Sequence, residues 1–311
     1  MKTQTKGILI TLLAAACFGA ASPIAKFVYR YDVTVGNVLL WRFIIATALV
    51  WGYILLFRKD LNLRLRKDQM LMMVVVGGLA HFLTTQCYFS ALKYVPISIH
   101  IMIFYTYPFI VNILSVMFFK EAISKIQLLS LVAAFIGILM TVTLDDIRMS
   151  FIGIFFSVVA AVSNTAYILC LGKRNVTELD SVVVGAYSSL FAGISYFLFC
   201  LARGELRVDM PLPCWAGIIA MAVFTTAVGA IALSFGVKII GSAKAAIVSV
   251  FEPIEAILLG ILLFHEKISL RGGIGIILVM GSIVLINYVQ MQTAEEAVIV
   301  QAPEETVVKD L

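Results

Sequence analysis

Two carboxylates and a proline occupy the middle of an otherwise apolar stretch, AAIVSVFEPIEAILLGILLF, towards the C-terminal end of the chain. Glu252 and Glu255 lie three residues apart on either side of Pro253, and a helix with this spacing places both carboxylates near one face. Carboxylates are costly at the centre of a bilayer-spanning helix, so we expect this face to point into the protein. Such groups could carry a proton or hold a cationic group of a bound molecule. The alternative is a structural ion pair or a hydrogen-bonded neutral acid.

Polar side chains also interrupt other apolar stretches of the sequence. The candidate binding residues for a substrate or a proton are Glu252, Glu255, His81, Gln86, Tyr105, Tyr107, Asn112 and Asn164. We expect His81, Tyr107 and Asn164 to contact a shared cavity. His100 lies nearer the outer end of its apolar stretch, and there we expect an interfacial position. The alternative for each of these residues is a hydrogen bond that only packs one helix against another.

Three further charged residues lie within or at the ends of apolar stretches. Arg42, in LLWRFIIATALV, could pair with a buried carboxylate, bind an anion or extend to the outer headgroups. Glu121 and Glu266 each end an apolar stretch, three residues before a serine that can cap the next helix. A carboxylate near a helix N-terminus is favourable. We interpret all three residues as structural.

The composition predicts a membrane protein. Of the 311 residues, 62% are hydrophobic and 13% are charged, and the mean hydropathy is +1.05. A soluble domain is about half apolar and about a quarter charged. The basic residues cluster at the ends of apolar stretches, so the net charge of +5 indicates membrane orientation and not nucleic-acid binding. The five cysteines have no metal-ligand spacing, and we expect no metal and no cofactor.

The apolar material divides into segments of about 20 residues, the length that crosses a bilayer as a helix. The fold class is therefore an all-α polytopic membrane protein with ten transmembrane helices. The expected spans are 7–29, 35–57, 69–91, 95–119, 125–143, 150–171, 181–202, 213–235, 243–264 and 271–290.

The distribution of Lys and Arg predicts that both termini are cytoplasmic. With this orientation fourteen basic residues lie in cytoplasmic segments and eight lie outside, and the 58–68 loop contributes most to the difference. The protein is then a multi-pass protein of the cytoplasmic membrane.

The two halves of the chain match each other at an offset of 145 residues. Lys93, Pro108, Glu121 and Ser124 correspond in this register to Lys238, Pro253, Glu266 and Ser269. Two repeats of five spans have opposite orientations because five is odd, and we expect them to surround a central cavity. The expected division is residues 1–146 for the first repeat, 147–290 for the second, inverted repeat, and 291–311 for a disordered acidic cytoplasmic tail.

Pro108 and Pro253 are expected to break their helices at corresponding places. Each proline leaves a carbonyl one turn earlier, at Phe104 and Ser249, without its usual helical donor. Paired interruptions in two inverted halves indicate a binding site near the middle of the membrane. The alternative is a pair of kinks that only shape helix packing.

These features resemble the EamA-type branch of the drug/metabolite transporter superfamily. The resemblance rests on the ten spans in two repeats, on WRFIIA in the second span, and on the segments FFKEAIS and LFHEKIS that end the proline-containing spans. FEPIEAILLGILLFHEKIS is similar to the signature of that family's second repeat, and the resemblance covers about residues 7–290. It implies a helical bundle with a central cavity, lined by spans one, three, four, six, eight and nine, that moves small metabolites.

The leading hypothesis is a secondary transporter that moves a small metabolite, such as an amino acid or an amine, by alternating access. Whether protons drive the transport is left open. A membrane-embedded enzyme is the alternative, and a receptor or scaffold is a third. The scattered histidines and the lack of a Gly-rich phosphate loop argue against an enzyme and against direct use of ATP. The expected partners are a small-molecule substrate, protons and the lipid bilayer, with no nucleic acid; a homodimer is left open.

The predicted orientation can be tested with single cysteines at positions 93 and 238 in a cysteine-free background. Lys93 is expected outside and Lys238 inside. A membrane-impermeant thiol reagent added to intact cells should therefore label position 93 and leave position 238 unlabelled until the cells are opened. The reverse pattern would overturn the orientation.

Overall fold

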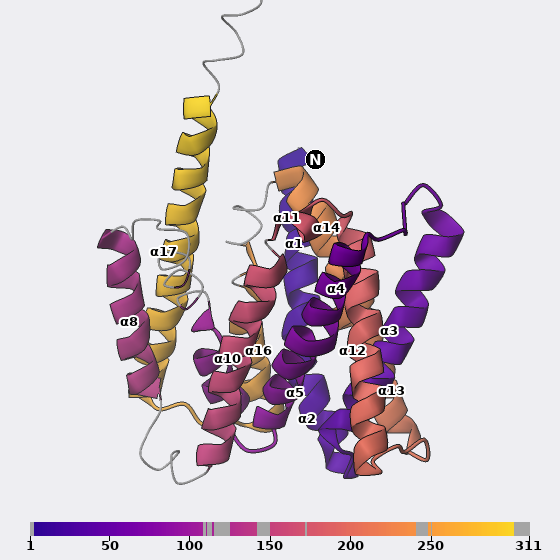
Figure 1. The fold of residues 1–311 in the computed structure, drawn as a ribbon. Coiled ribbons are helices and arrows are strands. Elements are labelled where there is room, and N and C mark those ends of the chain that lie inside the picture. Colours follow the sequence, from indigo (N-terminus) through magenta and orange to yellow (C-terminus); the bar gives the residue numbers. More distant parts are fainter. Residues whose placement is uncertain are drawn as a thin grey trace, which may run out of the picture.

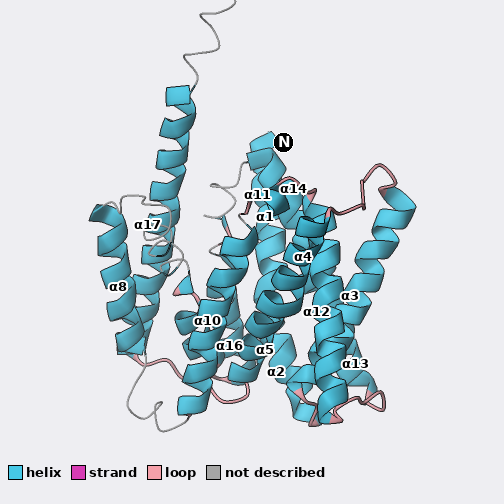
Figure 2. Cartoon of the chain, viewed as in Figure 1, coloured by secondary structure: helices cyan, strands magenta, loops and turns pink. Residues whose placement is uncertain are grey.

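The computed structural model describes residues 3–107, 110, 114, 125–141, 150–171, 173–240, 248–249 and 251–301. Every regular element in these ranges is a helix (Figure 2). The elements of the first half are α1 (Thr3–Gly19), α2 (Ala21–Val28), η1 (Tyr29–Tyr31), α3 (Val35–Phe57), α4 (Lys67–Met73), η2 (Val74–His81), α5 (Phe82–Ala91), α6 (Ile97–Phe104) and α8 (Lys125–Thr141). Those of the second half are α10 (Phe151–Leu171), α11 (Arg174–Thr177), α12 (Ser181–Arg203), α13 (Leu212–Ala220), η3 (Met221–Val228), α14 (Gly229–Ile240), α16 (Phe251–Phe264) and α17 (Leu270–Gln301).

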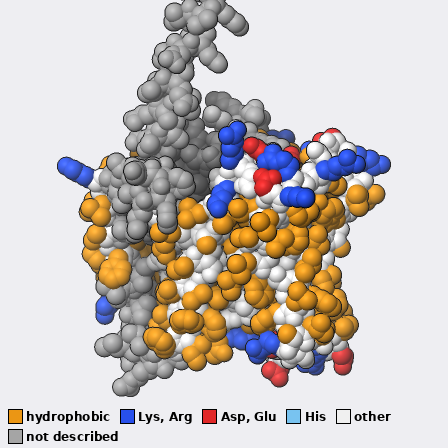
Figure 3. All heavy atoms as spheres, viewed as in Figure 1, with side chains coloured by type: hydrophobic (Ala, Val, Ile, Leu, Met, Phe, Trp, Pro, Cys, Tyr) orange, Lys and Arg blue, Asp and Glu red, His pale blue; other side chains and the backbone are white. Residues whose placement is uncertain are grey.

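The surface of the helical bundle carries a broad apolar band between two charged ends (Figure 3). Apolar residues such as Leu56, Phe155 and Leu262 are more than half exposed. Water would penalise so large an apolar surface, whereas lipid tails would cover it. Five continuous helical runs within the described ranges are long and apolar enough to cross a membrane, namely Gln4–Tyr31, Val35–Phe57, Lys67–Ala91, Phe151–Leu171 and Ser181–Arg203. The protein is a multi-pass membrane protein.

The remaining expected spans correspond to shorter or interrupted helices. Apolar helices of 10–17 residues lie at Leu128–Gly137, Leu212–Val228 and Leu270–Ser282. In the expected span 95–119, α6 ends at Phe104, and most of the residues from 108 onwards lie outside the described ranges. Helix α17 continues past residue 290, where we expected a disordered tail to begin, and ends at Gln301. Ala, Glu, Gln and Met in MQTAEEAVIVQ are good helix formers, which explains the extension.

The ends of the helices alternate between the two charged faces of the bundle (Figure 1). The start of α1, the α3–α4 connection, α11 and the C-terminal end of α17 lie at the upper face of this view. The α12–α13 connection lies at the lower face, and so does α2. The start of α1 and the end of α17 therefore lie on the same side as the basic 58–68 loop.

Helices in corresponding positions of the two halves begin in the same way. The hydroxyl of Thr34 accepts a hydrogen bond from the Asn37 amide at the start of α3. The carboxylate of Asp180 accepts one from the Val182 amide at the start of α12. Each cap satisfies a backbone donor that has no partner within its own helix. Thr34 and Asp180 are 146 residues apart, close to the offset between the halves.

Helix packing in one half has a counterpart in the other. Helix α1 packs against α14 and α16, and its counterpart α10 packs against α5 and α6. Helix α12 packs against η2, as α3 packs against η3. Three further close pairs join corresponding spans of the two halves: α3 with α12 on one side of the bundle, α8 with α17 on the other, and α6 with α16 between them (Figure 1). Exchanging the two halves therefore reproduces these pairs.

Both third spans contain a π-helical stretch, and this repeated feature was not predicted from the sequence. The π-helix η2 joins α4 to α5, and η3 joins α13 to α14 at the corresponding place. A π-helix widens the turn, re-aims nearby side chains and is frequent at functional sites. The two stretches therefore mark equivalent positions in the two halves of the bundle.

The backbone of η2 lies directly against α12 at Gly77. A Cβ atom added at Gly77 would lie 2.5 Å from the carbonyl oxygen and 2.8 Å from the Cα atom of Ser188. Both obstacles are backbone atoms, so a rotamer change could not relieve the contact. Small residues permit such close approach where lipid removes the hydrophobic drive for helix association.

Substitution Gly77→Ala is expected to force η2 and α12 apart and to lower the free energy of unfolding by about 1–3 kcal/mol, the usual cost of overpacking. Gly52→Ala is the matched control, because a Cβ atom at Gly52 would meet no atom within 4 Å. Thermal or denaturant unfolding of the purified proteins in one detergent measures both. Equal stability of the two variants would contradict the steric assignment.

Candidate functional site

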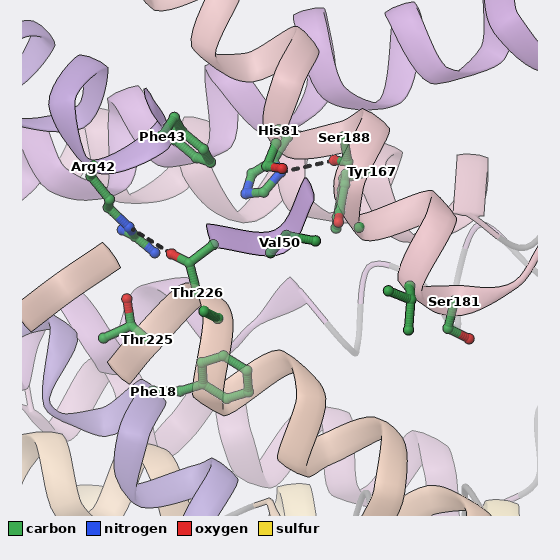
Figure 4. Close-up of a pocket in the computed structure, with 14 residues that line it drawn as sticks. Phe18, Arg42, Phe43, Val50, His81, Tyr167, Ser181, Ser188, Thr225 and Thr226 are labelled. Carbon is green, nitrogen blue, oxygen red and sulfur yellow. Dashed lines mark hydrogen bonds between the residues drawn. The ribbon is translucent and has the colours of Figure 1, made fainter. Parts of the chain in front are cut away.

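A cavity of about 300 Å³ lies within the bundle between helices of both halves. This is at the lower end of the range for small-molecule sites, about 300–1,000 Å³. Figure 4 shows side chains from α1, α3, η2, α10, α12 and η3 around it. The lining residues are Phe18, Arg42, Phe43, Val50, His81, Tyr167, Ser181, Val182, Gly185, Ser188, Ser189, Thr225, Thr226 and Ala227.

His81 lies at the end of η2 and is held by groups from three other helices. Its Nδ1 atom lies 3.1 Å from the Ser188 hydroxyl of α12 (Figure 4). The Tyr167 ring of α10 lies 5.0 Å from the imidazole, and Phe43 meets the imidazole edge-on at 5.2 Å. The close approach at Gly77 brings Ser188 to this position. These contacts fix the imidazole while one side of it faces the cavity.

Arg42 projects from α3 towards η3. Its Nε atom donates a hydrogen bond of 3.2 Å to the hydroxyl of Thr226 (Figure 4). The guanidinium also lies over the rings of Phe89 and Phe43, with its Cζ atom 5.2 and 5.6 Å from their centroids. Thr226 is the repeat counterpart of His81, so the two π-helical stretches contribute equivalent positions to one cavity.

Glu252 lies outside this cavity and within a cluster of hydroxyl groups. The Tyr105 hydroxyl lies close to the Glu252 carboxylate and interacts with it electrostatically. Tyr107 lies beside Tyr105, with ring centroids 5.8 Å apart, and Tyr88 interacts electrostatically with the same carboxylate. The hydroxyl of Tyr88 in turn lies 2.8 Å from the Ser22 hydroxyl of α2. We call these five residues the Glu252 cluster.

Glu255 faces α1 one turn later. A Cβ atom added at Gly19 would lie 3.0 Å from its Oε2 atom and 3.0 Å from the carbonyl oxygen of Glu252. Among the described residues, this buried Oε2 atom has no hydrogen-bond partner. The two carboxylates therefore lie between α16 and the helices packed on it, as the argument from lipid exposure predicted.

The chain is interrupted before both expected breaks, although the details differ from the sequence prediction. Helix α6 ends at Phe104, and Tyr105 and Thr106 form a turn. Pro253 lies in the first turn of α16, where its missing N–H costs no helical hydrogen bond. The carbonyl of Ser249, which we expected to lose its donor, accepts a 3.0 Å hydrogen bond from the Glu252 amide. The chain adapts to Pro253 with a tighter turn just upstream.

Comparison with known proteins identifies the family of this bundle. The sequence model of the EamA-like transporter family matches two consecutive parts of the chain, residues 5–143 and 151–288. The chain belongs to the EamA-like transporter family. This agrees with the resemblance drawn from WRFIIA and FEPIEAILLGILLFHEKIS.

Curated relatives carry the same general description. The uncharacterized transporter YcbK of Bacillus subtilis (strain 168) is 23% identical over 283 residues, which cover 88% of this chain and 90% of the relative. The uncharacterized transporter YyaM of the same strain is 25% identical over 261 residues, which cover 81% of this chain and 84% of the relative. A solved crystal structure superposes on 91% of this chain and 97% of the solved chain, with 17% sequence identity and a TM-score of 0.61. The two proteins therefore share the fold.

The residues predicted to share one cavity in this EamA-like transporter fall into two groups. His81 lines the cavity, whereas the lining includes neither Tyr107 nor Asn164. Tyr107 belongs to the Glu252 cluster, and its carbonyl accepts a 3.4 Å hydrogen bond from Thr165. Gln86 points to neither group and donates to the Ser90 hydroxyl at 3.2 Å. Pro108, Asn112 and Glu121 lie outside the described residues.

His100 is a correction to the sequence prediction. The expected interfacial position is wrong, because the side chain is fully buried and its Nδ1 atom lies 3.0 Å from the Ser157 hydroxyl of α10. The Tyr88 ring meets the imidazole edge-on at 4.2 Å. Serine and tyrosine from distant segments contact this imidazole, and the sequence around His100 does not reveal them. Its Nε2 atom is buried without a hydrogen-bond partner among the described residues.

Glu266 joins three separated parts of this EamA-like transporter at one end of the bundle. Its carboxylate forms a 2.9 Å ion pair with Lys26 of α2. The same carboxylate accepts hydrogen bonds from the Ile97 amide at 2.7 Å, the Ser98 amide at 3.1 Å and the Ser98 hydroxyl at 2.6 Å. We call this arrangement the Glu266 clasp. It caps α6, whereas the helix that comes after Glu266 along the chain, α17, is capped by Ser269, whose hydroxyl accepts from the Gly272 amide.

The Glu266 clasp sets the charge state of its own carboxyl group. Burial by itself raises the pKa of Glu266, but the hydrogen bonds from Ser98, the positive charge of Lys26 and the Ile97 amide outweigh it. The pKa of Glu266 consequently lies below its usual value. A carboxyl group whose pKa is lower in the folded protein than in the unfolded chain stabilises the fold above the unfolded-state pKa. This contribution is lost as the pH falls through the folded-state pKa.

Substitution Glu266→Gln is expected to lower the free energy of unfolding at neutral pH by about 1.5–3 kcal/mol, the range for hydrogen bonds to a charged group. The deficit should shrink at acid pH, because wild-type Glu266 is then protonated as well. Unfolding of both proteins across the acid range measures this convergence. Glu178→Gln is the control, since Glu178 forms only exposed pairs with Arg66 and Arg174. A deficit independent of pH would contradict the role of the charge.

Proposed function

We propose that this protein is a secondary transporter that moves a small metabolite across the cytoplasmic membrane by alternating access. The observation that carries the proposal is the cavity between the two halves, lined by Arg42, His81 and Ser188 among aromatic side chains. A cavity lined from both halves changes shape when one half moves against the other, and this is how alternating access works in duplicated transporters. Amino acids, amines and related compounds are the metabolites that we consider.

The proposed architecture is ten transmembrane helices arranged as two inverted repeats of five. Two observations support it: the packing pairs that are reproduced when the halves are exchanged, and the two consecutive matches of the family model. The equivalent π-helices η2 and η3, with His81 and Thr226 at corresponding positions, add a third. In this architecture residues 1–146 and 147–290 are the repeats, and both termini are cytoplasmic.

The Glu252 cluster is proposed to carry the coupling proton. Glu252 is half-buried next to the interruption at the start of α16, and none of the ion pairs among described residues includes it. Tyrosine hydroxyls can hydrogen-bond with either the charged or the neutral carboxyl group. Intramembrane carboxylates with such surroundings are typical proton carriers in transporters. Glu255, on the next turn against α1, is the proposed partner group.

Transport itself can be tested with the purified protein in sealed proteoliposomes. Amino acids, amines and organic acids are supplied one at a time, and radiolabelled uptake or counterflow is compared with that of protein-free liposomes. Saturable uptake that requires the protein is the expected result. Absence of uptake for every class, with protein of verified insertion and folding, would argue against the transporter.

Substitution Glu252→Gln separates the proton-carrying role from a structural one. The amide keeps the size and hydrogen bonding of the side chain but cannot titrate. The variant should lose accumulation driven by a pH gradient by at least about tenfold, as expected when an essential proton-transfer group is removed. It should keep substrate exchange at equal pH, which needs no net proton movement.

Glu205→Gln is the matched control, because Glu205 pairs with Arg203 in the exposed connection after α12. Accumulation in this variant should remain that of the wild type. Normal pH-driven accumulation by a well-folded Glu252→Gln protein would overturn the assignment. Equal loss of accumulation and exchange would indicate a structural role instead.

A further inference from the structure

Arg42 is a buried cation in the cavity for which the described residues supply no counter-charge. Its relative exposure is 8%, and its Nη1 atom is buried without a hydrogen-bond partner among the described residues. None of the residues that line the cavity is acidic. The ion pairs within the described part of the chain use Lys26, Arg58, Arg66, Arg174 and Arg203, and none uses Arg42.

The groups that do surround Arg42 are neutral acceptors and aromatic faces. Thr226 accepts from Nε, and the rings of Phe89 and Phe43 lie within cation–π distance. Tyr29, Tyr88, Tyr196 and His81 are the titratable groups that interact with Arg42 electrostatically. Phenols are neutral at physiological pH, and an imidazole is never negatively charged there, so none of them supplies a counter-charge. The two glutamates of α16 lie elsewhere: Glu252 belongs to the Glu252 cluster, and Glu255 faces Gly19. These contacts stabilise the guanidinium only in part.

An unpaired charge in a low-dielectric interior is costly, and a buried arginine normally has an anion beside it. Here the unpartnered Nη1 atom belongs to a side chain that lines the cavity, so a molecule in the cavity could supply that anion. Arginine binds carboxylates through short, charge-assisted hydrogen bonds. Thr226 holds the guanidinium through Nε, and the part of the Arg42 side chain that lines the cavity is available for such a bond.

The other residues that line the cavity limit which carboxylate-bearing molecules fit into it. Phe18, Phe43 and Tyr167 provide apolar and aromatic surface, and Ser188 and Thr225 provide hydroxyls. In Figure 4 Arg42 lies at one side of the space and Tyr167 at the opposite side, beyond His81. A small molecule with one anionic end and an apolar body matches this arrangement. A molecule whose only charge is positive does not, because Arg42 would repel it.

We propose that the cavity is a carboxylate site, in which Arg42 binds the carboxylate of a small organic acid or amino acid whose apolar body lies against Phe43 and Tyr167. The inference rests on the proposed transport function and narrows its substrate class. It replaces the purely structural role that was expected for Arg42 from the sequence. It also favours amino acids and organic acids over amines.

The test measures thermal stabilisation of the purified full-length protein by matched probes at constant pH and ionic strength. Benzoate, benzamide and benzylamine have the same apolar body and differ in charge, and hexanoate, hexanamide and hexylamine repeat the series without a ring. The carboxylates should raise the melting temperature in a saturable manner, and the amides and amines should not. Stabilisation by no carboxylate, or equal stabilisation by all three head groups, overturns the proposal.

Arg42 variants locate the effect. Arg42→Gln should weaken carboxylate binding by at least about tenfold, the loss expected for a hydrogen bond to a charged group. Arg42→Lys should retain the preference for carboxylates with lower affinity. Arg203→Gln is the control, because Arg203 is exposed and pairs with Glu205, and it should bind as the wild type does. Carboxylate stabilisation that persists in Arg42→Gln overturns the proposal.

Stability without any probe provides a test that does not depend on the choice of ligand. Removing an uncompensated buried cation should leave the melting temperature of Arg42→Gln equal to that of the wild type or above it. A large fall in the melting temperature would show that Arg42 pairs with an anionic group of the protein itself, and would overturn the proposal.

Flux in proteoliposomes separates the proposed carboxylate site from the proposed transport function. Carboxylate binding without flux would argue against transport and leave the site in place. Flux of amines that is independent of Arg42 would keep transport and remove the site.

Discussion

The structure depends on the requirement that the backbone polar groups within the apolar band find partners inside the protein. Lipid offers no hydrogen bonds, so the backbone is helical throughout the described spans, and irregular backbone is confined to protected places. Many buried side chains are paired in the same way, although buried atoms of Arg42 and Glu255 have no partner among the described residues. Thr85 with Tyr196 and Ser22 with Tyr88 form hydroxyl pairs between helices at 2.8 Å. The interruption before α16 satisfies the backbone requirement too, because the Ser249 carbonyl finds the Glu252 amide.

The same environment decides how the helices hold together. Burying apolar surface gains little when lipid tails are the alternative, so close contact and polar pairing carry the association. Gly77 against Ser188 is one example, and Gly19 against the Glu252 carbonyl is another. Each of these contacts borders one of the two candidate sites. The helix–helix approaches that stabilise the bundle therefore also position His81 and the two carboxylates of α16.

Much of the architecture could be predicted because span length and repetition are properties of contiguous residues. The five spans found in the described ranges, the capping of α17 by Ser269, and the family are examples. The environment of Arg42 could not be predicted, because Thr226 and Phe89 reach it from segments far away along the chain. The π-helices had no recognisable signal in the sequence. Grouping Tyr107 with His81 assumed that symmetry alone brings polar residues together, whereas Tyr107 belongs to the Glu252 cluster.

The Glu266 clasp has a consequence for how the chain is made. The amides at the start of α6 and the ammonium of Lys26 receive their counter-charge from a residue 169 positions beyond Ile97. During synthesis α2 and α6 are therefore made with one cation unpaired by Glu266 and one helix end uncapped by it. Both remain so until the segment after α16 has been made. The clasp therefore forms late in biogenesis, and a chain that is cut short before Glu266 lacks it.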